Sequence, residues 1–509
     1  MKLQRVLNSL TYDVICGTDE QEIREIQYDS RELKKGDLFV CLKGFRTNGH
    51  LFIDRALDAG ASAIVIQNDE RKVLEEKRIW AGRSITVISV SDTRYALAYM
   101  AAAYYDYPFR KLRTIGITGT KGKTTTSYMI RAGLMNGGHR SGLIGTIGIH
   151  TGKRQIKSAN TTPESLEVHK LMHEMVEAGC DSVVMEVSSQ ALKMNRVEGI
   201  LFDLGIFTNF GEDHIGPGEH RDLKEYLRCK KRLFSQCLVG IGNVDDKSYE
   251  EIVGDSECEK ITYGFGENAD YMAGQMEKIF INDVPSVSFV LRRARSLRGK
   301  KKAQGIEEKK LKIDLSMPGE FNVMNALAAI AALKHLEITD EVIIRTMRQM
   351  VVPGRMECVD ALPDCKVYID YAHNEMSLTE SLKILRSYCN GRLIVLFGCG
   401  GNRPRDRRFG MGKTAGIYAD YAIITTDNPR FESPQSILDD IECGIRQTAG
   451  KYIVIEDREK AIGYALEYHQ PGDVILIAGK GHETYQEIGG VKIPMDDRKL
   501  VRKCTQILS

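Results

Sequence analysis

The stretch TIGITGTKGKTTTSYMIRAGLMNGG, residues 114–138, decides the fold class. It begins as an apolar strand, continues through a glycine-rich loop, and then shows the helical spacing of Met129, Ile130 and Leu134 before a stop at Gly137. Glycines allow several backbone N–H groups to converge on phosphate oxygens, and the amino terminus of the helix adds its positive end. Because strand and helix flank the loop in this order, we predict that it binds the phosphates of ATP or GTP.

The loop departs from the most common phosphate-binding pattern at one position. A strict G-x-x-x-x-G-K-[ST] match requires glycine at position 117, where this chain has Ile117. The pattern still places Lys123 beside the β- and γ-phosphates and makes Thr124 a ligand of Mg²⁺. The helix is expected to begin near Thr124. A glycine turn with a surface lysine is the competing interpretation. The residues predicted to bind the nucleotide here are Gly119, Thr120, Lys121, Gly122, Lys123, Thr124 and Thr125.

Three compositional blocks make up the chain around this segment. At roughly 150 residues per domain, the 509 residues suggest three or four folded units. The sequence YYDYP at 104–108 closes the first block, and the break VPGR at 352–355 opens the third. We therefore predict domains at residues 1–108, 109–352 and 353–509.

Strands in the second and third blocks are continuous apolar runs, such as DVILIAG at 473–479, separated by helical segments. Continuous runs suit parallel strands buried on both faces, so we predict an α/β fold with several doubly wound sheets. Polar residues, among them Glu186, Asp370 and Asp427, come directly after these strands. Ligands in open α/β sheets bind beyond the carboxyl ends of the strands. Two such edges that face each other would form an active site at a domain interface.

The composition excludes several classes of protein. Lysine and arginine number 71 against 69 aspartate and glutamate, a formal net charge of +2, which leaves no basic excess for binding nucleic acid. No run of about 18 apolar residues is present, so we expect no membrane span, and the first residues turn polar too early for a signal peptide. The 12 cysteines include no C-x-x-C pair, which favours free thiols over a zinc or dithiol site. We expect a cytoplasmic protein.

A set of short motifs resembles one enzyme family along essentially the whole chain. The sequence is similar to the Mur ligases of peptidoglycan synthesis, and among them to the tripeptide synthetases. The resemblance implies three domains: a central P-loop-type parallel sheet, an amino-terminal α/β domain that binds a UDP-sugar, and a Rossmann-like carboxyl-terminal domain that binds an amino acid. The motifs are DSR (29–31), TGTKGKTT (118–125), NTT (160–162), MEVSS (185–189), TNFGEDH (208–214), GEFNVMN (319–325), VPGRME (352–357), DYAH (370–373), DNPR (427–430) and GKGHE (479–483).

The resemblance implies ATP-dependent peptide-bond synthesis. The D-glutamate γ-carboxylate of UDP-N-acetylmuramoyl-L-Ala-D-Glu attacks the γ-phosphate of ATP, and the amine of an incoming amino acid then displaces phosphate from the acyl phosphate. The implied ligands of Mg²⁺ are Thr124, Glu186, His214 and a carbamylated Lys230, since an ordinary ammonium would repel the metal. The residues expected to act in catalysis are Lys123, Lys230, His214 and Glu186. Without the resemblance, Lys230 would belong to a basic helix face and His214 would be a structural loop residue.

Further substrate contacts also follow from the resemblance. For the UDP-linked substrate it implies Ser30, Phe45, Arg46, Thr47, Asn48, Asn160, Thr161, Thr162, Ser188 and Arg196. For adenine and ribose it implies Asn322, Asn325, Arg355 and Asp370. Taken alone, the two asparagines could equally cap a helix that begins at residue 325. The chain departs from the usual family residues at Gln190, Met194, Asn374 and Glu375, which affects fine substrate contacts.

The motif DNPR at 427–430 indicates which amino acid is added. meso-Diaminopimelate differs from lysine by a carboxylate at the far end of its side chain, and Arg430 can grip a carboxylate through two parallel hydrogen bonds. Lysine would leave a buried guanidinium unpaired, unless Arg430 is a solvent-facing loop residue. In the family, this motif marks diaminopimelate enzymes. The amino-acid-binding residues expected are Arg403, Asp427, Asn428, Pro429, Arg430, Gly479 and Glu483, of which the last two would receive the distal ammonium.

Three alternative functions stay open at this point: a Mur ligase that adds lysine, a folylpolyglutamate-synthase-like ligase and a regulatory P-loop NTPase. A folate ligase needs no uridine-recognising domain, and an NTPase switch leaves the polar clusters of the third block unexplained. His169 and His173 lack the glutamate of a zinc motif, so we assign them to the surface or core of a helix. The charged run 293–312 is expected to be a solvated hairpin or loop. We expect small-molecule partners only and a monomer.

Overall fold

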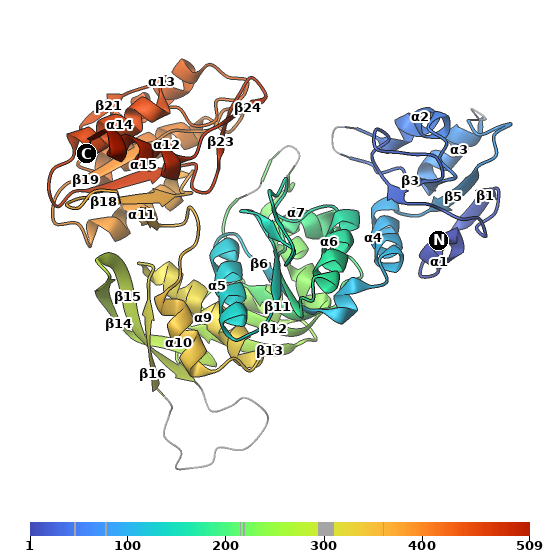
Figure 1. Cartoon of the computed structure of the whole chain (residues 1–509), viewed down its shortest axis with the longest axis horizontal. Helices are drawn as coiled ribbons and strands as arrows, with labels where there is room; N and C mark the ends of the chain where they lie inside the picture. Colours follow the sequence, from blue (N-terminus) through green and yellow to red (C-terminus); the bar gives the residue numbers. More distant parts are fainter. Residues whose placement is uncertain are drawn as a thin grey trace, which may run out of the picture. The chain divides into compact units, whose positions relative to one another are not determined.

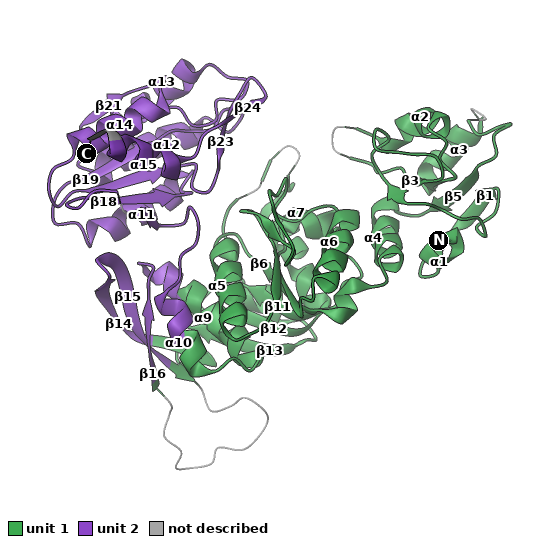
Figure 2. Cartoon of the chain, in the orientation of Figure 1, with its two compact units in different colours: residues 1–273, 292–310, 324–343 green, residues 274–291, 311–323, 344–509 purple. Residues whose placement is uncertain are grey.

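The computed structural model describes residues 1–44, 47–76, 79–213, 215–216, 219–293, 310–359 and 361–508 (Figure 1). The chain divides into two compact units (Figure 2). The first unit comprises Met1–Ala273, Arg292–Lys310 and Met324–Ile343, and the second comprises Gly274–Leu291, Leu311–Val323 and Ile344–Ser509. Within the described ranges, no helix has the length and apolar character needed to cross a membrane.

A five-stranded sheet forms the amino-terminal part of the first unit. Its strand order is β1-β5-β4-β3-β2, and neighbouring strands are parallel except β1 with β5. Val65 and Ile88 are buried in a core on one face, and Ile64 and Val87 in a core on the other. The elements are α1 (Leu3–Leu7), β1 (Asp13–Cys16), β2 (Ile26–Gln27), β3 (Leu38–Val40), η1 (Gly49–Phe52), α2 (Ile53–Asp58), β4 (Ala63–Gln67), α3 (Asn68–Glu76), β5 (Thr86–Val90), α4 (Thr93–Tyr104) and η2 (Pro108–Lys111).

The second sheet has eleven strands in the order β16-β15-β14-β13-β12-β11-β6-β10-β7-β8-β9. Strands β7, β10, β6, β11, β12, β13 and β14 pair in parallel. The strands are β6 (Arg113–Thr118), β7 (Ser141–Ile144), β8 (Ile149–His150), β9 (Gln155–Ile156), β10 (Ser182–Glu186), β11 (Phe202–Phe207), β12 (Cys237–Asn243), β13 (Glu259–Gly264), β14 (Tyr271–Ile281), β15 (Val284–Arg293) and β16 (Lys310–Leu315). The helices are α5 (Lys123–Asn136), α6 (Ser165–Glu177), α7 (Ser189–Lys193), α8 (Leu223–Lys231), η3 (Arg232–Ser235), η4 (Glu250–Gly254), α9 (Glu320–His335) and α10 (Asp340–Arg348).

The third sheet, in the second unit, has the order β17-β18-β22-β19-β20-β21 and is parallel except for the pair β17 and β18. Its central strands bury residues on both faces, with Tyr368 and Leu476 in one core and Ile369 and Ile477 in another. The strands are β17 (Glu357–Val359), β18 (Lys366–Asp370), β19 (Leu393–Phe397), β20 (Tyr421–Ile424), β21 (Tyr452–Val454) and β22 (Val474–Ala478), followed by the hairpin β23 (Tyr485–Ile488) and β24 (Val491–Pro494). The helices are α11 (Glu375–Arg386), α12 (Asp406–Tyr418), α13 (Pro434–Ile445), α14 (Arg458–Tyr468) and α15 (Asp497–Leu508).

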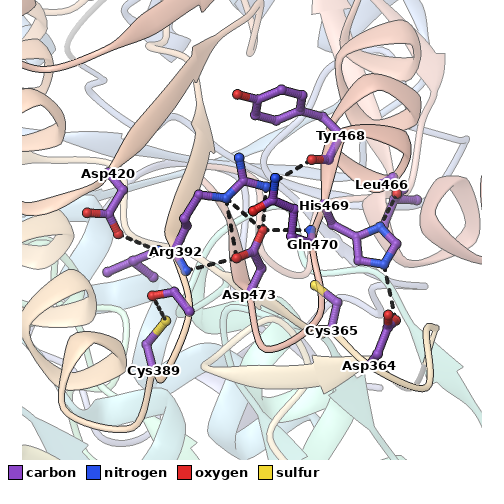
Figure 3. A network of polar contacts seen from close by, with 12 residues as sticks. Asp364, Cys365, Cys389, Arg392, Asp420, Leu466, Tyr468, His469, Gln470 and Asp473 are labelled. Atoms are coloured by element: carbon purple, nitrogen blue, oxygen red, sulfur yellow. Dashed lines mark hydrogen bonds and ion pairs between the residues drawn. The ribbon is translucent and has the colours of Figure 1, made fainter.

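An ion pair ties down the amino ends of strands in the third sheet (Figure 3). Arg392, directly before β19, reaches Asp473, directly before β22, with 2.6 Å between Nη2 and Oδ2. The backbone N–H groups of Arg392 and Gln470 also donate to Asp473, each at 2.8 Å, and Leu393 N–H donates to Asp420 at 2.7 Å. This network fixes the turns at the edge opposite the strand ends that carry the motif residues.

The structure confirms the predicted α/β class and the parallel, doubly buried strands. One prediction about a helix is wrong: α9 begins at Glu320 rather than at residue 325. Asn322 therefore lies inside the first turn, where its amide Nδ2 donates to Pro318 O at 2.8 Å. Most of the charged run 293–312 lies outside the described residues. The domain boundaries at residues 108 and 352 remain predictions.

Candidate functional site

The phosphate loop joins β6 to α5, as the sequence predicts. Ile117 is a buried residue of β6, so the position that departs from the common pattern lies in the strand before the loop. Gly122 has a φ of 86°, and a side chain there would collide with Asn325 Oδ1, so only glycine fits. The Lys123 ammonium folds back over the loop and donates to the carbonyls of Gly119 at 2.7 Å and Thr120 at 3.0 Å. The loop thus carries a cation at the amino terminus of a helix.

Residues at the end of β11 hold the loop in this conformation. Asn209 accepts from the Lys121 N–H at 2.9 Å through Oδ1 and donates back to the Lys121 carbonyl at 3.1 Å through Nδ2. Thr208 adds a second donor to the same carbonyl at 2.6 Å. The Thr120 hydroxyl lies 3.2 Å from the hydroxyl of Tyr226 on α8. These partners come from other elements, so contacts outside the loop help to hold its conformation.

Glu186 is the last residue of β10, and it is completely buried. Its carboxylate accepts a 2.8 Å hydrogen bond from the Thr124 hydroxyl at the start of α5. It also accepts from the Thr146 N–H at 2.9 Å and from the Thr146 hydroxyl at 3.0 Å. A buried carboxylate surrounded by hydroxyl groups is a set of oxygen atoms of the kind that Mg²⁺ prefers.

Lys230 lies in the last turn of α8 with a relative exposure of 1%. Its Nζ lies 4.4 Å from the centre of the Tyr226 ring, and among the described residues it makes no ion pair with a carboxylate. Burial, with the neighbouring Lys123 cation, holds the pKa of Lys230 well below its ordinary value. Lys231, by contrast, is half-exposed and pairs with Asp255 at 3.3 Å. The two neighbouring lysines therefore differ in burial and in surroundings.

Four of the residues expected to bind the UDP-linked substrate lie around Glu186. The Thr162 hydroxyl donates to the Glu186 carbonyl at 2.8 Å and accepts from the Ser188 N–H at 3.1 Å. The Thr161 hydroxyl lies 3.1 Å from that of Thr146. Arg196 donates to the Thr162 carbonyl at 3.0 Å. Asn160, at the start of the same segment, is exposed.

The other UDP-substrate residues belong to the amino-terminal sheet. Ser30 is buried after β2. Asn48 caps η1 through a 3.1 Å bond from the His50 N–H and donates to Glu70 at 3.0 Å, while the Thr47 carbonyl accepts from Gly44 N–H. These contacts give Asn48 a structural role in its loop. Phe45, Arg46 and His214 lie outside the described residues.

In the second unit, Asp370 ends β18 and is surrounded by donors. It accepts from the N–H groups of Met356 at 2.8 Å and Ala372 at 3.0 Å and from the Ser381 hydroxyl at 3.1 Å. Burial raises the pKa of Asp370, and the nearby Arg355 cation opposes this shift. The Arg355 guanidinium lies 4.7 Å from the centre of the Tyr371 ring, and its buried Nε has no hydrogen-bond partner in the described part of the chain.

The residues expected to bind the amino acid follow β19, β20 and β22. Arg430 donates from Nη1 to the Gly401 carbonyl at 2.6 Å and lies 3.4 Å from Glu487 through Nε, with 26% of its side chain exposed. Asn428 donates to Glu483 at 2.8 Å. Arg430 and Arg403 both lie within about 4 Å of the position a side chain on Gly400 would occupy. The Pro429 carbonyl lies so close to Gly401 that no larger residue fits there. At Gly479, beside the Asp427 carboxylate, a φ of 107° disfavours any residue with a side chain.

Three family profiles match the chain in succession. They are the Mur ligase family, catalytic domain (22–105), the Mur ligase middle domain (117–333) and the Mur ligase, glutamate ligase domain (354–481). The UDP-N-acetylmuramoyl-L-alanyl-D-glutamate–2,6-diaminopimelate ligase 1 of Clostridium acetobutylicum is 39% identical over 98% of this chain and 98% of its own. The corresponding ligase of Caldanaerobacter subterraneus subsp. tengcongensis is 40% identical over 99% of this chain and 98% of its own. The chain belongs to the Mur ligase family.

A solved structure supports the assignment. The structure of a UDP-N-acetylmuramoyl-L-alanyl-D-glutamate–2,6-diaminopimelate ligase matches this Mur ligase with a TM-score of 0.68 at 26% identity and covers 100% of this chain and 99% of that chain.

The structure of this Mur ligase adds residues that the sequence motifs missed. Thr146, which makes two hydrogen bonds to Glu186, comes just after the apolar run of β7, so the rule of polar residues after strands would have found it. Glu164 lies between Arg94 at 2.8 Å and Arg196 at 3.6 Å. No sequence signal indicated Glu164, because its two partners come from α4 and from the segment after α7.

The oxygen atoms around Glu186 fit Mg²⁺, the metal of Mur ligases. The Thr124 hydroxyl and the Glu186 carboxylate are within hydrogen-bond distance of each other and are both buried, and each could contribute one oxygen ligand. No cluster of three or more His, Cys, Asp or Glu side chains that could hold a metal occurs in the part of the chain that the structure describes. A metal at this position would therefore depend on phosphate oxygens, water or a modified lysine for its remaining ligands.

Proposed function

We propose that this Mur ligase joins 2,6-diaminopimelate to UDP-N-acetylmuramoyl-L-alanyl-D-glutamate in an ATP-dependent reaction of peptidoglycan precursor synthesis. The observation that carries the proposal is the placement of Arg430 in the same strand-end cluster as Glu483, which Asn428 links to the DNPR loop. The distal carbon of diaminopimelate bears a carboxylate and an ammonium, and this cluster offers a guanidinium for the first and a carboxylate for the second. Relatives about 39% identical over nearly the full length carry the name of this reaction.

The first step is phosphoryl transfer from ATP to the γ-carboxylate of the D-glutamate residue. The carboxylate oxygen attacks the γ-phosphorus, the bond to the β-γ bridging oxygen breaks, and ADP leaves with that oxygen. Such a transfer needs positioning and neutralisation of charge more than covalent help from the protein. Lys123, already held over the loop carbonyls, would supply a cation to the phosphates, and the N–H groups of the loop would bind their oxygens.

Magnesium would be held by Thr124 and Glu186. When bound, it neutralises phosphate charge. The Glu186 carboxylate accepts hydrogen bonds from the Thr124 and Thr146 hydroxyl groups, and these contacts orient both hydroxyl groups toward it. Loss of either partner would leave this buried carboxylate less well oriented.

Lys230 is the proposed site of a carbamate. A carbamate forms when the nitrogen lone pair of a neutral amine attacks the carbon of CO₂, and the amine then releases one proton. The lowered pKa of Lys230 favours the neutral amine that this reaction requires, whereas an ordinary lysine is protonated near pH 7. The modified side chain would present anionic oxygens in place of a cation in this buried site.

In the second step, the amine of the amino acid attacks the acyl phosphate and displaces inorganic phosphate. Residues of the second unit would select this amino acid through its distal end. A lysine substrate has no distal carboxylate, so it would offer Arg430 no anionic contact beyond the Glu487 carboxylate that the guanidinium already meets at 3.4 Å, and it would gain nothing from this cation. Arg355, with an unpaired buried Nε, and Asp370 are the proposed partners of the ATP ribose and base.

A phosphate-release assay tests the proposed function. The enzyme is given ATP, Mg²⁺, the UDP-linked dipeptide and one amino acid from a set that includes meso-diaminopimelate, L-lysine and L-glutamate, and products are identified by mass. We expect phosphate release and tripeptide formation with meso-diaminopimelate, and none when either co-substrate is omitted. Equal use of lysine, glutamylation of a folate, or hydrolysis without an amino acid would each contradict the proposal.

A further inference from the structure

A fully buried lysine lies beneath the amino-acid cluster of the second unit. Lys480 directly follows Gly479 at the end of β22, and none of its side chain is exposed. Its ammonium donates to Asn428 Oδ1 at 3.0 Å and to Glu483 Oε2 at 3.2 Å. A buried ammonium is stable only when it is paired and hydrogen-bonded. The pairing therefore links Lys480 to two of the residues expected to bind diaminopimelate.

The Lys480 ammonium determines how the Asn428 amide is oriented. Asn428 Oδ1 receives hydrogen bonds from Lys480 and from the Glu487 N–H at 2.9 Å. Both of these groups can only donate, so the amide oxygen must face them and the NH₂ group must point the other way. Asn428 Nδ2 accordingly donates to Glu483 Oε2 at 2.8 Å. The flipped amide would bring two donors against a cation and would lose all three hydrogen bonds.

The same contacts leave one oxygen of Glu483 available. Oε2 accepts from Lys480 and Asn428, whereas Oε1 accepts no hydrogen bond from the residues that the structure describes. Three other ionisable groups act on this carboxylate: Asp427 after β20, Tyr371 after β18 and Arg458 on α14. Burial raises the pKa of Glu483 and Asp427 adds to the shift, while Lys480 opposes it. Lys480 is thus the cation that directly contacts Glu483.

We propose that Lys480 is a positioning residue for the incoming amino acid: it holds Glu483 as a carboxylate with Oε1 available for the distal ammonium, and it fixes the donor face of Asn428. The inference rests on the proposed function for the identity of the ligand. It assigns Lys480 no contact with substrate. A lysine that only filled space in the core would leave the charge of Glu483 and the binding of the amino acid unchanged when a side chain of similar size replaced it.

The test is Lys480→Met, which keeps most of the aliphatic stem and removes the charge. With meso-diaminopimelate as substrate, we expect its KM to rise on the order of 10-fold or more, with smaller changes in kcat and in the KM for ATP. The acid limb of kcat/KM for the amino acid should move to higher pH, since Glu483 then protonates more readily. Lys492→Met is the matched control, because Lys492 is exposed and lies 4.4 Å from the same Tyr485 ring that Lys480 approaches at 5.7 Å.

A second measurement does not depend on turnover. The carboxyl carbon-13 resonance of Glu483, identified by its loss in Glu483→Gln, should titrate at higher pH in Lys480→Met than in the unchanged enzyme. An unshifted titration overturns the inference whichever amino acid is the substrate. The inference would also be overturned if Lys480→Met folded, used diaminopimelate, and showed the wild-type KM for it and the wild-type acid limb of kcat/KM.

A double variant covers the case in which Lys480→Met alone fails to fold. Lys480→Met with Glu483→Gln removes both charges of the buried pair. Its KM for diaminopimelate should be no worse than that of Glu483→Gln alone, because both substitutions remove the same interaction. A KM for diaminopimelate that is clearly higher in the double variant than in Glu483→Gln would show that the two residues act independently, and would contradict the role assigned to Lys480. Failure of the proposed function has a different outcome: the wild-type enzyme itself would then not turn over diaminopimelate.

Discussion

The Thr124 hydroxyl donates a 2.8 Å hydrogen bond to the carboxylate of Glu186, 62 residues further along the chain. The parallel register of β10 and β6, in which Glu186 pairs with Ile117, places the carboxylate beside the start of the phosphate loop. Two residues from separate motifs therefore form one group of oxygen atoms in the first unit.

The contact between Thr124 and Glu186 predicts the effect of removing one hydroxyl. Thr124→Val keeps the shape of the side chain but removes an oxygen expected to bind Mg²⁺, so kcat for phosphate release should fall on the order of 100-fold. Thr126→Val is the control, because Thr126 lies in the same helix and its buried hydroxyl has no hydrogen-bond partner in the described structure. Equal activity of the two variants across a Mg²⁺ titration would argue against a metal at Thr124.

The buried Lys230 predicts that activity depends on CO₂. Enzyme stripped of CO₂ should lose turnover and regain it with bicarbonate, and Lys230→Met should be inactive under both conditions. Intact mass under native conditions should show one CO₂ per active chain. Lys231→Met is the control, since Lys231 is half-exposed and pairs with Asp255. Full activity with a demonstrably unmodified Lys230 would contradict the carbamate.

Arg430 predicts the selection of the amino acid. Arg430→Ala should raise the KM for diaminopimelate by about 100-fold, because a charge-assisted contact of a few kcal/mol is lost, and should leave the KM for ATP nearly unchanged. Arg446→Ala, which removes an exposed pair with Glu442 and a hydrogen bond to the Tyr452 hydroxyl, should leave both constants unchanged. If Arg430→Ala still preferred diaminopimelate over lysine, residues other than Arg430 would have to recognise the distal carboxylate.

His169 predicts part of the pH dependence of stability. Burial lowers the pKa of His169 to about 3, whereas its value in the unfolded chain is near 6.5. The unfolded chain therefore binds one more proton below pH 6.5, and the free energy of unfolding decreases as the pH falls from there toward pH 3. His169→Leu should reduce the loss of unfolding free energy between pH 7.5 and pH 5 by about 2 kcal/mol.

Chemical denaturation at these two pH values measures the His169 effect. His173→Leu is the matched control, because His173 lies one turn further along α6 with 39% of its side chain exposed. The two ring nitrogens of His169 have no hydrogen-bond partner in the described structure, so leucine strands no other polar group there. The same slope with pH in wild type and His169→Leu would show that His169 does not cause the loss.

Much of the fold could be predicted from local patterns. Apolar runs such as that of β10 and β22 correctly indicated buried parallel strands, and the polar residues that follow them lie at the carboxyl ends of the sheets. The start of α9 was predicted five residues too late, because Asn322 and Asn325 resemble capping residues while the helix in fact begins after Pro318 and Gly319. The local preference of asparagine for helix caps did not show whether these residues precede the helix or lie in its first turns.

The sequence by itself determined the class of fold, the phosphate loop and the motif residues that follow the strands. These depend on the spacing of apolar side chains and on glycines within a few residues, which act locally. Only the tertiary structure placed Thr146 against Glu186, buried Lys230 beside Tyr226, and joined Lys480 to Asn428 and Glu483. Those contacts depend on the register between strands distant in the chain, and the packing of the whole sheet sets that register.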